Sequence, residues 1–270
     1  MLSIPGIIYD ADLFNDESLY FKKDGTIGAN AAAVADGDCS AGPDGVWGTS
    51  DDGLPDTWND FLKLLEEIRV KNYTPFTWAT QPSSYQISRV FNAIWANYEG
   101  YDNFMLNYSL KGKDSVLGTI DENNYTKLLQ QEGRKAAIKA FYDITSISEN
   151  YSDKVPTNNH TGAEREYIQS YREIGGSQRI AMFAENSYWE QEAREDVFNK
   201  EPSQYGYGKR NFRYMPIPRF ENVTGIKDQK NKQRVLPAAY AESYICLNAQ
   251  TSNKNAEVQT KVAKLFIKFM

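Results

Sequence analysis

Hydrophobic residues recur at intervals of three and four along several stretches of this chain, a spacing that places side chains on one face of an α-helix. The clearest stretch follows Thr57, and Asp60 completes a capping box there with Asp in place of the usual Glu. A further helix is expected from about Ser187 to Asn199. The apolar positions that define the other helices are Trp58, Phe61, Leu62, Leu65 and Ile68; Ile87, Val90, Phe91, Ile94, Trp95 and Tyr98; Leu128, Leu129, Ala136, Ala137, Ala140, Phe141 and Ile144; and Val258, Val262, Leu265, Phe266 and Phe269.

Short extended segments separate these helices. One of them, from Ala238 to Leu247, alternates apolar and polar positions with the period of two that a half-buried strand requires. Short strands near the chain ends and after residue 178, with helices between them, indicate an α/β or α+β architecture, and we take the helix-rich α/β fold as the prediction. The remaining extended segments are residues 2–9, 74–78, 179–184 and 212–217.

An insertion of about residues 30–56 has no periodicity and is dominated by Gly, Asp, Ala, Ser and Pro, which are turn residues. Carboxylates on a tightly turning backbone are the hard oxygen ligands that Ca²⁺ binds. The spacing does not match an EF-hand, because the glutamate at its twelfth position is missing. A calcium site and a simple solvated loop therefore remain alternatives, and the candidate ligands are Asp36, Asp38, Asp44, Asp51 and Asp52.

Composition narrows the function classes. The 270 residues carry a formal net charge of -6, which argues against a protein that grips a nucleic-acid backbone. No apolar run is long enough to span a bilayer. The 18 Tyr, 13 Phe and 5 Trp form a surplus of aromatic residues. Core packing explains many of them, but Tyr and Trp also suit binding faces, since each joins a flat apolar ring to a hydrogen-bonding tip.

Catalytic and metal motifs are scarce. The chain has two cysteines, Cys39 and Cys246, which give no disulfide framework or cysteine metal site, although they are able to pair with each other. No G-x-S-x-G, H-E-x-x-H or phosphate-binding glycine motif occurs. The single histidine, His160, lies in a polar stretch and is assigned no role. Enzymatic activity is therefore not expected, and no cofactor is required beyond the calcium considered above.

Four segments, taken in order, resemble the extracellular solute-binding proteins of carbohydrate ABC importers, often called family 1. Residues 6–14 (GIIYDADLF) are similar to a strand and turn of that family, and residues 54–76 to its Pro-x-Thr-Trp-x-Glu-Phe helix and following strand. Residues 179–193 resemble a strand that leads through a small-residue turn to a tryptophan, here with a tyrosine inserted before Trp189. FRYMPIPRF and the segment from Ala238 to Met270 complete the likeness.

The resemblance implies a lobe of a type II periplasmic-binding-protein fold, in which two α/β lobes joined by hinge strands close on a sugar. Residues 1–270 would be mainly the C-terminal, helix-rich lobe, with hinge crossings near residues 6–12 and 238–247. Both ends of the chain look cut, so an excised piece of a longer protein is expected. The implied partners are a carbohydrate and the membrane permease subunits of an importer. An extracellular, lipid-anchored full-length protein that acts as a monomer is expected.

Sugar clefts combine aromatic platforms for C–H faces with polar groups for hydroxyl edges. Trp189 begins a helix after a strand, so it is a candidate for stacking on a sugar, with packing between elements as the alternative. For Tyr9 and Asp10, at the first hinge crossing, the alternative to ligand contact is an ordinary turn after a strand. For Tyr240 and Glu242, at the second crossing, the alternative is solvent exposure. The full set of candidate ligand-binding residues is Tyr9, Asp10, Trp78, Asn186, Tyr188, Trp189, Tyr240 and Glu242.

The function that follows is capture of a sugar or oligosaccharide for import. Two rivals remain open. A glycoside hydrolase would place two carboxylates beside a sugar that rests on aromatic platforms. A cell-surface carbohydrate-binding or adhesion module would use the same rings without an importer.

Overall fold

The computed structural model describes residues 4–81, 85–112, 117–172, 179–229 and 256–269. Apart from the first two residues, the chain divides into two compact units, Ser3–Ala238 and Ala239–Met270. The described part of the second unit is one helix, α10 (Ala256–Phe269). The predicted strand at 238–247, with Tyr240, Glu242 and Cys246, lies outside the described residues. No described helix has the combination of length and apolar character needed to cross a membrane.

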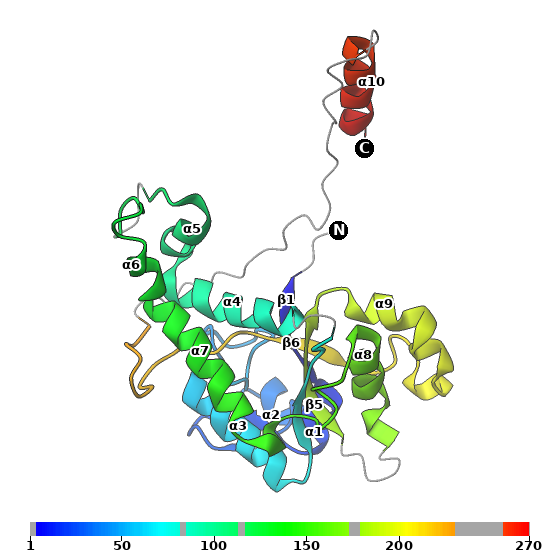
Figure 1. Ribbon diagram of the computed structural model, residues 1–270. Coiled ribbons are helices and arrows are strands. Elements are labelled where there is room, and N and C mark those ends of the chain that lie inside the picture. Colours follow the sequence, from blue (N-terminus) through cyan, green and yellow to red (C-terminus); the bar gives the residue numbers. More distant parts are fainter. Residues whose placement is uncertain (1–3, 82–84, 113–116, 173–178, 230–255, 270) are drawn as a thin grey trace. The chain divides into compact units, whose positions relative to one another are not determined.

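A four-stranded mixed sheet organises the first unit (Figure 1). Its strands lie in the order β4 (Thr74–Thr77), β5 (Ile180–Asn186), β1 (Pro5–Asp10) and β6 (Phe212–Met215). Strand β4 runs parallel to β5, whereas β1 is antiparallel to both of its neighbours. The extended segments expected at 2–9, 74–78, 179–184 and 212–217 therefore supply all four strands.

Both faces of the central strands are covered. Every residue of β1 and of β5 is buried, which explains why their sequences are nearly continuous apolar runs and do not alternate. Neighbouring residues still face opposite sides, because side chains alternate along a strand. Ile7 belongs to one hydrophobic core, and Ile8 belongs to the other.

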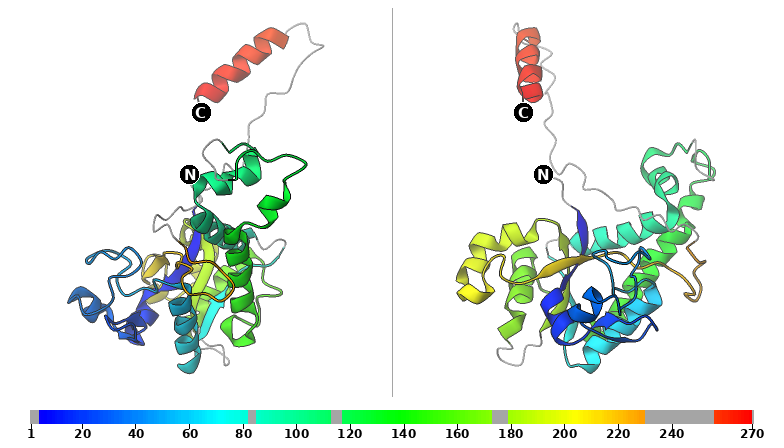
Figure 2. Two further views of the ribbon diagram at one scale, coloured as in Figure 1. Left: turned by 90° about the vertical axis from the view of Figure 1, so that its left-hand side faces the viewer. Right: turned by 180° about the vertical axis from the view of Figure 1, so that it is seen from behind.

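The two cores are built by different helices (Figures 1 and 2). The larger core includes residues of α3 (Trp58–Val70), α4 (Tyr85–Glu99) and α7 (Glu132–Thr145). The smaller core includes Ala163, Tyr167 and Ile168 of α8 (His160–Gln169), with Trp189 and Ala193 of α9 (Trp189–Asp196). The views in Figures 1 and 2 place α8 and α9 on one side of the sheet and α3, α4 and α7 on the other. The fold of this unit is α/β, as expected.

The remaining elements are short. Helix α1 (Ala11–Asp16) follows β1 directly and is followed by a small hairpin of β2 (Tyr20–Phe21) and β3 (Ile27–Ala29). The insertion expected at about residues 30–56 comes next and begins with the helix α2 (Ala31–Ala35). Helices α5 (Tyr101–Ser109) and α6 (Thr126–Leu129) lie between α4 and α7. The short 3₁₀ turns are Ser148–Asn150, Ser170–Arg172, Phe198–Lys200 and Ser203–Tyr205.

The predicted start of α3 is confirmed. The Thr57 hydroxyl accepts a hydrogen bond from the Asp60 amide, and the Asp60 carboxylate accepts one from the Thr57 amide at 3.4 Å, so the capping box is complete with Asp in the Glu position. Trp58 then stacks on Phe220, with ring centroids 5.1 Å apart. The first turn of α3 is thus fixed both by its cap and by the core.

One predicted helix is wrong in its extent. The apolar positions from Leu128 to Ile144 were expected on a single helix, but the chain breaks between α6 and α7 at Gln131, whose backbone is extended. The Gln131 side chain is buried, and its Oε1 accepts hydrogen bonds from the Trp95 indole (3.1 Å) and from the side-chain amide of Asn107 (2.9 Å). It also donates to the Asn103 carbonyl. These tertiary bonds outweigh the helix propensity of glutamine.

Helices α4 and α7 approach closely at Gly133. A Cβ atom added there would lie 2.6 Å from the Trp95 carbonyl oxygen and 2.7 Å from Cγ of Glu99. The Gly133 amide also donates to the Glu99 carboxylate at 2.6 Å, so the backbone has little room to move away.

We expect Gly133→Ala to lower the free energy of unfolding by about 1–3 kcal/mol, because the added methyl overpacks the α4–α7 contact. Gly206→Ala is the matched control, since its Cβ would meet neighbours only at 3.6 Å and beyond, without a positive φ. Urea unfolding of both variants measures the difference. Equal stabilities would contradict the close approach.

Candidate functional site

The carboxyl ends of β4 and β5 meet at one edge of the sheet, and two helices begin beside that edge. After β4, Thr80 donates its amide to the Asn158 carbonyl, which places the start of α8 next to the strand. The Asn159 side chain caps α8 by accepting from the Gly162 amide at 2.7 Å. After β5, the Asn186 side chain accepts from the Tyr188 amide at 2.9 Å and forms the turn into α9. Ligands of α/β sheets commonly bind at such an edge.

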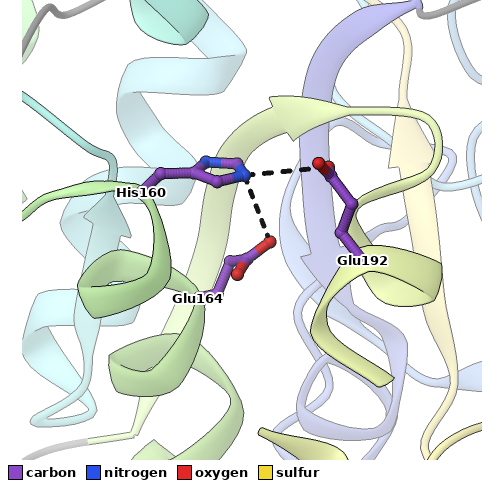
Figure 3. Close-up of side chains that lie close together, drawn as sticks. All are labelled: His160, Glu164 and Glu192. Carbon is purple, nitrogen blue, oxygen red and sulfur yellow. Dashed lines mark ion pairs between the residues drawn. The ribbon is translucent and has the colours of Figure 1, made fainter. Parts of the chain in front are cut away.

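A histidine and three glutamates gather at this edge, and Figure 3 draws His160, Glu164 and Glu192 of this group. His160 Nδ1 lies 3.0 Å from Oε2 of Glu185, and its Nε2 lies 3.5 Å from Oε1 of Glu164 and 3.7 Å from Oε2 of Glu192. The four residues come from three elements: α8 supplies His160 and Glu164, β5 supplies Glu185, and α9 supplies Glu192. We call this group the His160 cluster.

Burial gives the His160 cluster unusual acidities. Hydrogen bonding to Glu185 raises the pKa of His160 to about 9, with the charges of Glu185, Glu164 and Glu192 adding to the effect. Loss of hydration raises the pKa of Glu164 to about 8, although the nearby imidazolium opposes the shift. Burial also raises the pKa of Glu185, whose side chain is fully buried. The folded protein therefore holds extra protons here at neutral pH.

Tyr214 on β6 lies next to the His160 cluster. Burial raises the pKa of its hydroxyl, and the charge of Glu185 adds to the shift. The ring lies against Gly6 of β1, where an added Cβ would lie 2.8 Å from the ring. The residue is still 39% exposed, so the ring has a surface to offer.

Trp189 takes the packing role, which the sequence left as the alternative to stacking. It is 2% exposed and is surrounded by aromatic rings with centroids 5.1 to 6.1 Å away. An indole enclosed in this way offers no face to a sugar. The surrounding rings are Tyr167, Phe183, Phe198 and Phe212.

The other expected aromatic platforms are also enclosed. Tyr9 is 1% exposed and packs on Phe14, and Trp78 is 3% exposed and packs on Phe76 and Tyr151. Tyr188 is half-buried and precedes α9. Asn186 is buried in the turn described above. Among the described candidates, Tyr188 alone keeps an appreciable accessible surface.

Asp10 has a structural role in place of the expected contact with a ligand. It is fully buried, caps α1 by accepting from the Leu13 amide, and binds two arginines. Its Oδ2 lies 2.9 Å from Nη2 of Arg179 and 2.5 Å from Nη2 of Arg210. The carboxylate thereby joins the end of β1 to segments far along the chain.

The carboxylates of the insertion bind the loop's own backbone. Asp51 accepts from the Asp44 amide at 3.0 Å, Asp52 accepts from the Gly48 amide at 2.9 Å, and Asp44 accepts from the Val46 amide. Asp36 ends α2, and Asp38 lies 3.8 Å from Lys23. All five aspartates are described, and no three of them converge as a metal-ligand group in the described chain. Calcium binding by backbone and side-chain oxygens together stays a prediction.

Sequence reasoning missed the His160 cluster and Tyr214. The signal was present for part of it, since His160 and Glu164 stand four residues apart behind Asn159, a good N-cap residue. On the sequence alone, His160 lies in a polar stretch and is assigned no role. Glu185 directly follows the extended segment expected at 179–184, and nothing local shows that it contacts a histidine from another element.

Comparisons with known proteins give structural likenesses only. No family model matches the chain, and no curated protein matches it significantly. Among solved structures it is similar to apo RafE from Streptococcus pneumoniae, with a TM-score of 0.48, 16% identity, and coverage of 80% of this chain and 40% of that chain. It is also similar to a chitin oligosaccharide binding protein, with a TM-score of 0.46, 16% identity, and coverage of 82% of this chain and 39% of that chain. For a probable secreted solute-binding lipoprotein from Streptomyces coelicolor the TM-score is 0.44 and the identity 12%, with coverage of 83% of this chain and 39% of that chain.

The chain thus spans about 40% of the length of these structures. TM-scores below 0.5 at such low identities assign neither a family nor a ligand to it.

We expect Asp10→Asn to lower the free energy of unfolding by about 3–5 kcal/mol, because the arginine pair is left without its buried counter-charge. Asp16→Asn is the control, since Asp16 is 61% exposed and 3.8 Å from Arg179, and it should change stability by about 0.5 kcal/mol or less. Chemical denaturation of the two variants at neutral pH gives the comparison. A mild effect at position 10 would contradict the structural role.

The His160 cluster should make stability fall as pH rises. The pKa of His160 is raised to about 9 and that of Glu164 to about 8, so the folded state binds more protons than the unfolded state between about pH 5 and pH 9. The stabilisation is complete below the unfolded pKa values and is lost as pH passes the folded ones. Glu164→Gln should flatten the decline by up to about 1 kcal/mol per pH unit. Chemical unfolding of both proteins in EDTA from about pH 5 to about pH 9 measures this dependence of stability on pH. A free energy of unfolding that rises with pH would refute the raised pKa values of the His160 cluster.

Proposed function

We propose that this chain is a large part of an extracellular solute-binding protein that captures a carbohydrate for an ABC importer. One observation supports this most: the described segments that resemble that family come together in one sheet, although they are scattered along the chain. Residues 6–14, 54–76, 179–193 and 212–220 contribute β1, β4, β5 and β6 respectively.

The edge that carries the His160 cluster has the chemistry of a sugar subsite. Glu192 is exposed and His160 is half-buried, so both can exchange hydrogen bonds with sugar hydroxyls. Tyr214 adds a ring with an accessible surface for a C–H face. Glu185 connects the two parts, because it contacts His160 and its charge acts on Tyr214.

In the proposed protein, this edge is one wall of a cleft, and a second lobe supplies the other wall. Closure of the lobes on the sugar would create the form that the permease subunits recognise. The protein would act outside the cell as a lipid-anchored monomer without enzymatic activity. A lobe on its own would bind sugar weakly, because half of the contacts are missing.

We expect the intact protein to bind an oligosaccharide and Tyr214→Ala to weaken that binding about tenfold, the loss of roughly 1.4 kcal/mol that one ring face contributes. Tyr214→Phe keeps the ring and should bind nearly as well. Tyr142→Ala removes a 66% exposed tyrosine of α7 and should have no effect. Titration calorimetry against a panel that includes raffinose, chitin oligosaccharides and galactose gives the affinities.

The same samples separate the rival functions. Analysis of the recovered sugars detects hydrolysis, and cleavage by the native protein would favour a glycoside hydrolase over a transport receptor. Absence of binding to every sugar at millimolar concentration would contradict the proposal. Equal affinity of Tyr214→Ala and native protein would instead place the sugar elsewhere.

A further inference from the structure

Three side chains of the His160 cluster have the arrangement of metal ligands. His160, Glu164 and Glu192 each present one ligand atom, and these atoms all lie within 4.8 Å of one another. Figure 3 shows the imidazole Nε2 facing both carboxylates, which come from two different helices. We propose that these three residues bind a divalent transition-metal ion, with Zn²⁺ as the best fit.

The distances suit a tetrahedral ion. Zinc binds imidazole nitrogen and carboxylate oxygen at about 2.0–2.2 Å, which puts tetrahedral ligand atoms about 3.3–3.5 Å apart. Nε2 of His160 lies 3.5 Å from the Glu164 oxygen and 3.7 Å from the Glu192 oxygen. Movements of a few tenths of an ångström would bring these two pairs into place, and the two carboxylate oxygens lie within 4.8 Å of each other. Exposed Glu192 can adjust with little hindrance.

The histidine is already oriented for a metal. Its other ring nitrogen, Nδ1, lies 3.0 Å from Oε2 of the fully buried Glu185 carboxylate. Histidines that bind metals usually direct their second nitrogen to a carboxylate, which fixes the ring and leaves the other nitrogen to the ion. Glu185 is therefore a positioning residue for the proposed site, and it does not itself contact the ion.

A buried oxygen at the site independently points to a cation. Glu164 is 3% exposed, and its Oε1, the atom nearest to His160 Nε2, has no hydrogen-bond partner. A buried carboxylate oxygen without a hydrogen-bond partner is costly, and a bound cation would offset that cost. The ligand set also discriminates between ions. One nitrogen and two carboxylates suit Zn²⁺, whereas Ca²⁺ and Mg²⁺ favour six or more oxygen ligands.

Three protein ligands leave one position of a tetrahedral ion unfilled. Glu192 is 44% exposed, so the site opens to solvent on that side. Three protein ligands with an open fourth position is the pattern of zinc sites that accept a water or another small oxygen ligand. We therefore expect an exchangeable ion and not one locked into the core.

The test uses the intact protein stripped with EDTA and titrated with ZnCl₂ alone. We expect one equivalent to bind with a Kd on the order of 1 µM and to raise the melting temperature. His160→Gln should abolish binding, and Glu192→Gln should weaken it at least about tenfold. Glu195→Gln is the matched control on the same helix, since Glu195 is 77% exposed and outside the cluster.

Co²⁺ in place of Zn²⁺ gives a second readout, because strong visible absorption distinguishes a tetrahedral site from an octahedral one. Glu192→Gln alters a half-exposed side chain and should leave the apo protein folded, so it keeps the test valid if His160→Gln fails to fold. The proposal is overturned if no ion binds at about 100 µM free zinc or if Glu192→Gln binds as tightly as native protein. Neither outcome depends on whether the protein binds a sugar.

Discussion

The antiparallel pairing of β1 with β5 is the constraint on which the described fold depends. These strands come from distant parts of the sequence, and each is covered on both faces. Every backbone group in such a pair must find its partner within the sheet, because water is excluded. The cores on the two faces are filled from alternate residues of the same strands, so a slip of one residue would exchange them. Register in this pair therefore fixes which helices cover which face.

The pairing also places the polar groups. Asp10 closes the end of β1 and holds Arg179 and Arg210, while Glu185 near the end of β5 meets His160. Each of these two buried carboxylates faces a basic group from another segment, which lowers the cost of burying an isolated charge. Charge compensation from distant parts of the chain thus joins the sheet to the segments around it. The same buried charges that stabilise this edge of the sheet also give it polar groups that can bind a ligand.

Local pattern was enough to predict the capping box of α3 and the extended segments at 2–9, 74–78, 179–184 and 212–217, which overlap the four strands of the sheet, because those features depend on nearby residues. It failed where tertiary contacts decide. Gln131 stops a helix through bonds to α4 and α5. Exposure was the least predictable property, since an aromatic residue such as Trp189 has the same sequence signature in a core as on a binding face. The His160 cluster combines three elements, and no single segment reveals it.

The enclosure of Trp189 has a spectroscopic consequence. Of the five tryptophans, it is the one in the core beneath α8 and α9, whereas Trp58 and Trp78 lie in the other core, Trp95 packs against that other core and Trp47 is exposed. Indole emission depends on the polarity around the ring. In a variant that keeps Trp189 as its sole tryptophan, the fluorescence would therefore report how α9 packs on the sheet. Quenching by small solutes would then follow local opening beside the histidine, separately from unfolding of the rest of the sheet.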